Sequence, residues 1–242
     1  MDDVAGGLHF FDDDGNDLAS LDDFFDMQDG DRAVRALYIT PDLNGFSFGI
    51  SAANSQSGSD GDDDLNGSGL EPAVALYYEG ETGIGDVAAA LSYRRTRLDD
   101  DLENDFLVGS ASVLLASGLN ATVAASRGDI EGQDETPTAY FMKLGYLRDI
   151  LDTGETRFSV DYFRGRNNAE FGSPGGDLVE AHSWGFFAVQ EFADINTEAY
   201  LGFRHYELDG VFVEDIRRDV DDMNAVLVGA RVRFLPAQHA YG

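Results

Sequence analysis

Eleven segments of the chain alternate apolar and polar residues, and the links between them alternate between short and long. Alternation with a period of two places apolar side chains on one face of a β-strand and polar side chains on the other. In one such segment Phe48 and Ile50 oppose Ser47 and Ser51. The pattern predicts antiparallel strands at Arg32–Thr40, Phe46–Ala52, Ala73–Glu79, Val87–Arg94, Leu107–Leu115, Leu119–Ser126, Tyr140–Tyr146, Arg157–Phe163, His182–Gln190, Glu198–Tyr206 and Asn224–Phe234.

The alternation of link lengths distinguishes between two all-β folds. A soluble β-sandwich also has alternating strands, but its long links do not gather at one end. Short turns at one end and long loops at the other are typical of an antiparallel up-and-down transmembrane β-barrel, which we therefore predict. Charged residues near the centres of the polar strand faces fit a water-filled lumen. Aromatic residues near strand ends fit interfacial girdles, namely Tyr38, Tyr78, Tyr93, Tyr140, Tyr146, Trp184 and Tyr206.

Composition narrows the classes of partner. The 242 residues include 46 acidic and 16 basic side chains, which gives a formal net charge of −30. Such a surface repels phosphate, so we expect no nucleic acid to bind, and it attracts cations. Cysteine is absent, which rules out disulfides and thiolate metal sites. No apolar run approaches the roughly 18 residues that a membrane helix needs.

Three regions follow from this pattern. Residues 1–31 carry eleven Asp and no Lys or Arg, and we predict an acidic loop that folds against another part of the protein. Residues 32–234 hold the strands, and residues 235–242 form a C-terminal tail. We see no boundary that divides the strand region into two domains.

Two short motifs suggest chemistry, and each lacks part of its required context. Gly45–Gly49 matches the nucleophile elbow around Ser47, but an elbow needs a strand, a turn and a helix, and no His and acid are identified beside Ser47. Asp62, Asp64 and Asn66 resemble the start of a calcium loop. Its final Glu is missing, so loose calcium binding and a merely solvated loop both remain open. The four His have no metal-ligand spacing. We predict no catalytic residue and no other cofactor.

The basic residues on polar strand faces have two interpretations. They either set an electric field across a pore or form ion pairs within the lumen, such as Arg204 with Glu198 and Arg157 with Asp161. Both can hold together. The residues are Arg35, Arg94, Lys143, Arg157, Arg204, Arg231 and Arg233.

Several segments resemble alphaproteobacterial general porins of the Gram-negative porin superfamily. The stretches that carry the resemblance are Asp3–Leu8, Ser110–Leu114, Lys143–Tyr146, Ser159–Tyr162, Ser183–Gly185, Ala188–Gln190 and Gly229–Phe234. The family implies a sixteen-stranded homotrimeric barrel whose third loop folds inward at a constriction. Residues 1–31 resemble that loop. Eleven strands after the loop and about five before it would complete the barrel, with the long loops outside the cell and the short turns in the periplasm.

The resemblance also assigns roles to individual residues. Phe234 resembles the terminal aromatic residue that is part of the signal to the barrel-assembly machinery, although the tail 235–242 follows it here. Because Met1 is followed by Asp2 and Asp3, we expect no signal peptide in these residues and interpret the chain as the C-terminal portion of a porin. The acids expected at the constriction are Asp12, Asp13, Asp14, Asp17, Asp22, Asp23 and Asp26.

We therefore expect a passive diffusion channel in outer-membrane lipid that admits small hydrophilic solutes, prefers cations and is not an enzyme. The alternative is a secreted acidic β-protein that binds calcium or glycan. Eleven antiparallel strands cannot close into a barrel without a parallel seam. We expect an open, curled sheet with the strands at Arg32–Thr40 and Asn224–Phe234 as its edges.

Overall fold

The structure is a computed structural model of the chain. It describes residues 9–11, 17–20, 25, 27, 34–55, 69–97, 103–131, 135–167, 180–209, 211–213, 216–218 and 220–233.

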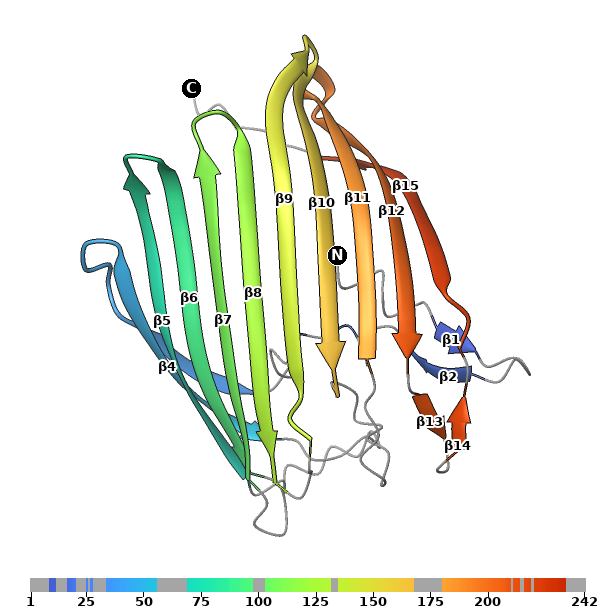
Figure 1. Cartoon of the computed structure of the whole chain (residues 1–242). Coiled ribbons are helices and arrows are strands. Elements are labelled where there is room, and N and C mark those ends of the chain that lie inside the picture. Colours follow the sequence, from blue (N-terminus) through green and yellow to red (C-terminus); the bar gives the residue numbers. More distant parts are fainter. Residues whose placement is uncertain are drawn as a thin grey trace, which may run out of the picture.

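One antiparallel sheet of eleven strands forms the body of the protein (Figure 1). The strands follow one another in chain order, and each pairs with the next in an up-and-down arrangement. The predicted number of strands and the all-β fold class are confirmed. The strands are β3 (Arg35–Ile39), β4 (Phe46–Ser55), β5 (Gly69–Thr82), β6 (Gly85–Arg97), β7 (Glu103–Leu115), β8 (Leu119–Ile130), β9 (Thr138–Leu151), β10 (Gly154–Arg166), β11 (Glu180–Phe192), β12 (Thr197–Asp209) and β15 (Met223–Val232).

Most strands are longer than their alternating segments. β9 runs over Thr138–Leu151, whereas the alternation indicates only Tyr140–Tyr146. Some of the added residues interrupt the alternation because both faces are polar there, as where Arg95 lies opposite Asp105 in the register of β6 and β7. Hydrophobic alternation marks only the part of a strand that has one apolar face, so it underestimates strand length.

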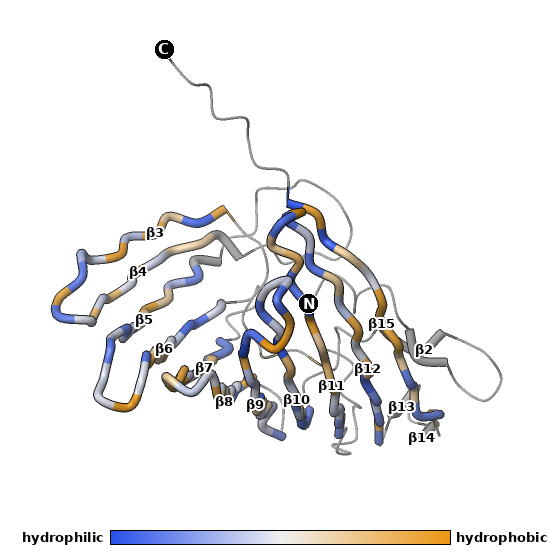
Figure 2. The backbone as a smooth tube through the Cα atoms, turned by 90° about the horizontal axis from the view of Figure 1, so that it is seen from above, coloured by the Kyte–Doolittle hydropathy of each residue, from blue (hydrophilic) through white to orange (hydrophobic). Residues whose placement is uncertain are grey.

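The sheet is curled and open. Viewed from above, it bends from β3 round to β15 and leaves a concave and a convex face (Figure 2). The edge strands β3 and β15 each pair with only one neighbour, β4 and β12 respectively. This confirms the expected edges.

Tight turns join the strands at one end, which we call the short-turn end and which lies at the top of Figure 1. The opposite end is the long-loop end. The turn between β7 and β8 requires glycine at Gly118, which has φ +87°. A Cβ atom there would lie 2.0 Å from the carbonyl oxygen of Leu147. This carbonyl belongs to β9, so the turn packs closely against the neighbouring hairpin.

Two small hairpins lie outside the main sheet. The first, β1 (His9–Phe11) with β2 (Asp17–Ser20), falls in the acidic segment, where the sequence predicts only a loop. The second, β13 (Val211–Val213) with β14 (Ile216–Arg218), falls in the link between β12 and β15. The described residues include one 3₁₀ helix, η2 (Ala193–Ile195). Within the described residues, no helix has the length and apolar character needed to cross a membrane.

The two faces of the sheet have opposite chemistry. Apolar side chains of the convex face are exposed, with 54% of Met142, 61% of Leu144 and 72% of Val228 accessible. The concave face carries polar and charged side chains, many of them buried by neighbours. Tyr206 is an exception to the predicted girdle, because it lies on the concave face and is only 7% exposed. The strand alternation places it two residues beyond Arg204, which faces the same way.

Candidate functional site

All seven basic residues predicted to face the lumen lie on the concave wall. The cross-strand register and the ion pairs show this placement. They occupy three levels along the strands. Arg35 and Arg94 lie near the long-loop end, Lys143 and Arg204 near the middle, and Arg157, Arg231 and Arg233 near the short-turn end.

Glu198 on β12 is the centre of the cluster at the short-turn end. Its side chain is 4% exposed and accepts hydrogen bonds from Arg157 Nη1 at 3.0 Å and Arg233 Nη2 at 2.8 Å. Arg231 donates from Nε at 2.9 Å and also from Nη2. The arginines come from β10 and from β15 and its end, so the single carboxylate ties the last strands of the sheet together. Arg157 also contacts Glu155 at 2.5 Å.

A second ion pair spans the middle of the wall. Arg204 on β12 donates to Asp161 on β10 at 2.6 Å, across the intervening strand. Gly185 leaves the space for this crossing, since a Cβ atom there would lie 3.1 Å from Arg204 Nε. The ring of Phe187 lies against the guanidinium, 5.2 Å from centroid to Cζ.

The partners in these pairs differ from those that the sequence suggests. Arg204 binds Asp161 rather than Glu198, and Arg157 binds Glu198 rather than Asp161. Arg204 and Glu198 are six residues apart on one strand, a separation of about 20 Å. Residues on the next strand but one lie only about 10 Å away. Register therefore decides the partners, and proximity in sequence does not.

Glu71 is the centre of a third cluster, at the long-loop end. Its buried carboxylate accepts hydrogen bonds from Arg35 at 2.6 Å and from Arg94 at 3.3 Å. Thr96 donates a further bond at 3.2 Å. The Arg94 guanidinium also lies 4.5 Å from the ring centroid of Phe106. Glu71 is absent from the sequence predictions because it lies beyond the alternating part of β5.

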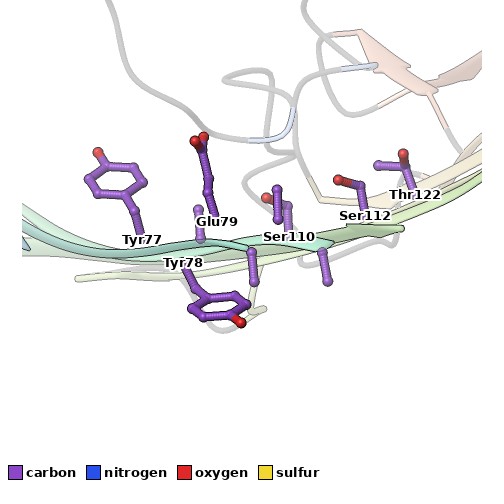
Figure 3. Close-up of a pocket in the computed structure, with 10 residues that line it drawn as sticks. Tyr77, Tyr78, Glu79, Ser110, Ser112 and Thr122 are labelled. Atoms are coloured by element: carbon purple, nitrogen blue, oxygen red, sulfur yellow. The ribbon is translucent and has the colours of Figure 1, made fainter. Parts of the chain in front are cut away.

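The wall on β5–β8 has a different character. Its concave side chains are mostly small, and Figure 3 shows Ser110, Ser112 and Thr122 on the same side of the sheet as Glu79, with Tyr78 on the other side. An open hollow lies over this region and borders three acids, Glu79, Glu81 and Asp86.

These three acids are exposed, and none has a side-chain partner among the described residues. None of the three is among the site residues predicted from the sequence. Alternation could have found them, because Glu79 and Glu81 share a face with Tyr77, and Asp86 lies opposite Glu81 in the hairpin.

Lys143 is the one predicted lumen base that forms no ion pair with the described residues. It lies opposite Asp161 in the register of β9 and β10, but the Asp161 carboxylate is bound to Arg204. The Lys143 side chain is half-buried beside Thr122 on β8.

Phe25 brings the acidic N-terminal segment against the concave wall. Its ring lies 5.4 Å from Phe163 and 5.1 Å from Tyr206, the latter edge-to-face. Both partners are buried, as is Leu208 further along β12. Phe25 therefore contacts the interior of the curl near the long-loop end.

The remaining sequence predictions fall largely outside the described residues. Asp17 lies in β2, although its side chain is not described, and the other six predicted constriction acids are outside. Phe234 and the trio Asp62, Asp64 and Asn66 are also outside. Within the described part of the chain, no three His, Cys, Asp or Glu side chains are grouped to hold a metal ion. Ser47 lies within β4, so the strand–turn–helix of a nucleophile elbow is not formed there.

Comparison with protein families decides the class of protein to which this wall belongs. A sequence model of the Gram-negative porin family matches residues 1–211. The chain belongs to the Gram-negative porin family. This porin is accordingly an outer-membrane channel. A search of curated proteins and a search of solved structures each found no match.

Proposed function

We propose that the porin is a passive diffusion channel that prefers cations and admits small hydrophilic solutes. The observation that carries this proposal is the unequal pairing of charges on the concave wall. Six of the seven predicted lumen bases lie within 4 Å of a carboxylate oxygen. Glu79, Glu81 and Asp86 have no such partner among the described residues. The positive charges are therefore locally neutralised, while negative charge remains free to attract cations.

The acidic N-terminal segment supports the same preference. We propose that residues 1–31 narrow the channel and that Asp12, Asp13, Asp14, Asp17, Asp22, Asp23 and Asp26 raise the local concentration of cations there. The contact of Phe25 with Phe163 and Tyr206 supports a position of this segment inside the curl.

Assembly is part of the proposal. Lipid offers no hydrogen bonds to an open strand edge, so β3 and β15 require partner strands within the membrane. We propose a closed barrel in outer-membrane lipid, a homotrimer, insertion by the barrel-assembly machinery and a channel that needs no cofactor. The exposed apolar convex face supports lipid contact and weighs against a secreted soluble protein.

The test is the reversal potential of the channel in a planar bilayer with a KCl gradient. We expect a potential of the sign that cation preference produces, and anion preference or no preference would overturn the proposal. The triple variant Glu79→Gln, Glu81→Gln, Asp86→Asn should lower the ratio of cation to anion permeability several-fold.

The matched control is Glu207→Gln, Asp209→Asn, Asp222→Asn. It removes the same charge from the convex side of the long-loop end, outside the lumen. We expect little change in the permeability ratio. An equal effect of the two triple variants would show that total charge, and not the lumen acids, sets the preference.

A further inference from the structure

One cross-strand row on the concave wall carries polar side chains without partners in the described part of the chain. Each residue of this row lies directly opposite the next in the register of β5 to β9. We call it the polar row. Its residues are, in order, Glu79, Ala88, Ser112, Thr122 and Lys143.

The two ends of the polar row carry opposite charges. Glu79 is exposed and Lys143 is half-buried, and neither forms an ion pair with the described residues. The hydroxyl groups of Ser112 and Thr122 lie between them, also without a hydrogen-bond partner among the described residues. Figure 3 shows Glu79, Ser112 and Thr122 on the same side of the sheet. The row therefore offers a carboxylate, two hydroxyl groups and an ammonium group in that order.

The register continues beyond Lys143, but the next charges are already paired. Lys143 lies opposite Asp161 on β10, whose side chain is buried and binds Arg204 across Gly185. Both oxygens of the Asp161 carboxylate accept hydrogen bonds from Arg204 Nη2. Asp161 is thus occupied by Arg204, and the row of available polar groups ends at Lys143.

The polar row lies in the open hollow over β5–β8. The residues of the row that border the hollow are Glu79, Ala88, Ser112 and Thr122. Glu81 and Asp86 lie one pair further toward the short-turn end and add negative charge beside Glu79. The hollow therefore has room for a ligand that touches the row along its length, and its negative end is reinforced.

The length of the row limits the size of the ligand. Four strand spacings of about 4.8 Å separate its ends, which gives about 19 Å along the sheet. An extended peptide spans about 3.4 Å per residue, so about four or five residues cover this distance. The side chains of Glu79 and Lys143 reach toward each other over the hollow, so a peptide of four residues is long enough to contact both.

We propose that the polar row binds short zwitterionic peptides, with the N-terminal ammonium group at Glu79 and the C-terminal carboxylate at Lys143. Opposite charges attract at both ends, and the hydroxyl groups of Ser112 and Thr122 can both donate to and accept from the peptide backbone. A peptide is favoured over a simple cation or anion because each of those uses only one end of the row. This inference rests on the proposed function, which places the concave wall on the path of solutes.

The experiment measures block of the ion current by tetraglycine, as a function of peptide concentration, in planar bilayers that contain the full chain. Glu79→Gln with Lys143→Gln leaves the net charge of the wall unchanged. It should weaken binding about tenfold, or about threefold for each ion pair in contact with water. The matched control is Arg148→Gln with Glu207→Gln, which is also neutral in net charge, lies on the convex face and should leave binding unchanged. Lys143→Arg keeps the positive end and should retain binding.

Peptides with one blocked end assign the two contacts. Lys143→Gln should weaken binding of tetraglycine but not of tetraglycine amide, which has no terminal carboxylate. Glu79→Gln should weaken binding of tetraglycine but not of N-acetyltetraglycine, which has no terminal ammonium group. Equal losses for the free and the blocked peptide would overturn the assignment of that end.

The inference as a whole is overturned by equal binding of tetraglycine to the wild-type protein and to the double variant at Glu79 and Lys143. Equal losses in that variant and in the convex control, or no measurable binding to the wild-type protein, would also overturn it. Saturation-transfer NMR of tetraglycine with the full chain in detergent micelles repeats the measurement without ion flow. The reversal potential in a KCl gradient tests the proposed function separately, so cation preference without peptide binding removes this inference alone.

Discussion

The concave wall has two halves that use charge in different ways. The open half, β5–β8 toward the short-turn end, has small side chains and the acids Glu79, Glu81 and Asp86, which have no side-chain partner within the described part of the chain. The paired half, β10–β12 with β15, has aromatic side chains and arginines that bind the buried carboxylates of Asp161 and Glu198. Both halves face one lumen.

The difference separates structural charge from functional charge. A carboxylate bound by several arginines is largely neutralised and holds strands together, and removing it leaves cations without a partner. An exposed carboxylate without a partner contributes little to stability but attracts ions from solution. The number of charges on a pore wall therefore says less about selectivity than the fraction of them that is paired.

The largest expected effect is a loss of stability when the central acid of the paired half is replaced, compared with an acid of the open half. Glu198→Gln should lower the free energy of unfolding by about 3 kcal/mol, because Arg157, Arg231 and Arg233 lose their shared partner. Glu79→Gln should change it by less than about 0.5 kcal/mol. Guanidinium unfolding followed by fluorescence of the single tryptophan, Trp184, measures both. Similar losses in the two variants would remove the distinction between the halves.

A smaller loss of stability is expected when the contact between the acidic segment and the paired half is removed. Phe25→Ala removes two ring contacts, which together contribute about 2 kcal/mol. We expect lower stability and larger current fluctuations in the open channel, because the segment is less firmly held. Phe25→Leu keeps most of the apolar contact and is the control. Unchanged current noise in Phe25→Ala would contradict a position of the segment in the ion path.

Replacing a glycine by alanine should lower stability by different amounts on the strands of the two halves. In the paired half, a Cβ atom at Gly202 would lie 2.7 Å from the ring of Phe187, so Gly202→Ala should cost about 1–3 kcal/mol. On β7, which belongs to the open half, Gly109 faces the convex side, and the nearest atom to a Cβ there is the flexible Leu91 Cδ1 at 3.4 Å. Gly109→Ala should change stability by at most about 0.5 kcal/mol. Thermal unfolding of the two variants, side by side, checks this.

The smallest effect should come from raising the salt concentration, which should reduce the preference for cations. The screening length falls from about 10 Å at 0.1 M to about 3 Å at 1 M salt. The attraction of cations by the exposed acids of the open half should therefore weaken, and the permeability ratio should approach that of the ions in bulk water. The stability loss in Glu198→Gln should persist at 1 M, because its carboxylate is buried. Reversal potentials and unfolding titrations at both salt concentrations test the two statements.

Several predictions from the sequence hold because they depend only on local alternation. All eleven strands, their order and the two edges were accessible in this way. Strand ends were not, because residues such as Arg95 and Asp105 are polar on both faces of the extended strands. The hairpin β1–β2 was missed since acidic residues interrupt any alternation there. Tyr206 was misassigned to the girdle because its position near a strand end was given more weight than its face.

The sequence by itself determined the fold class, the family resemblance and the face on which each lumen base lies, since these depend on a period of two along single strands. Only the tertiary structure decided which charges meet. Arg204 finds Asp161, and not Glu198, because the register of β10, β11 and β12 brings them within reach over Gly185. Register couples residues that are 43 positions apart in the chain. No pattern within one strand carries that information, so the paired and open halves of the wall become visible only in the folded sheet.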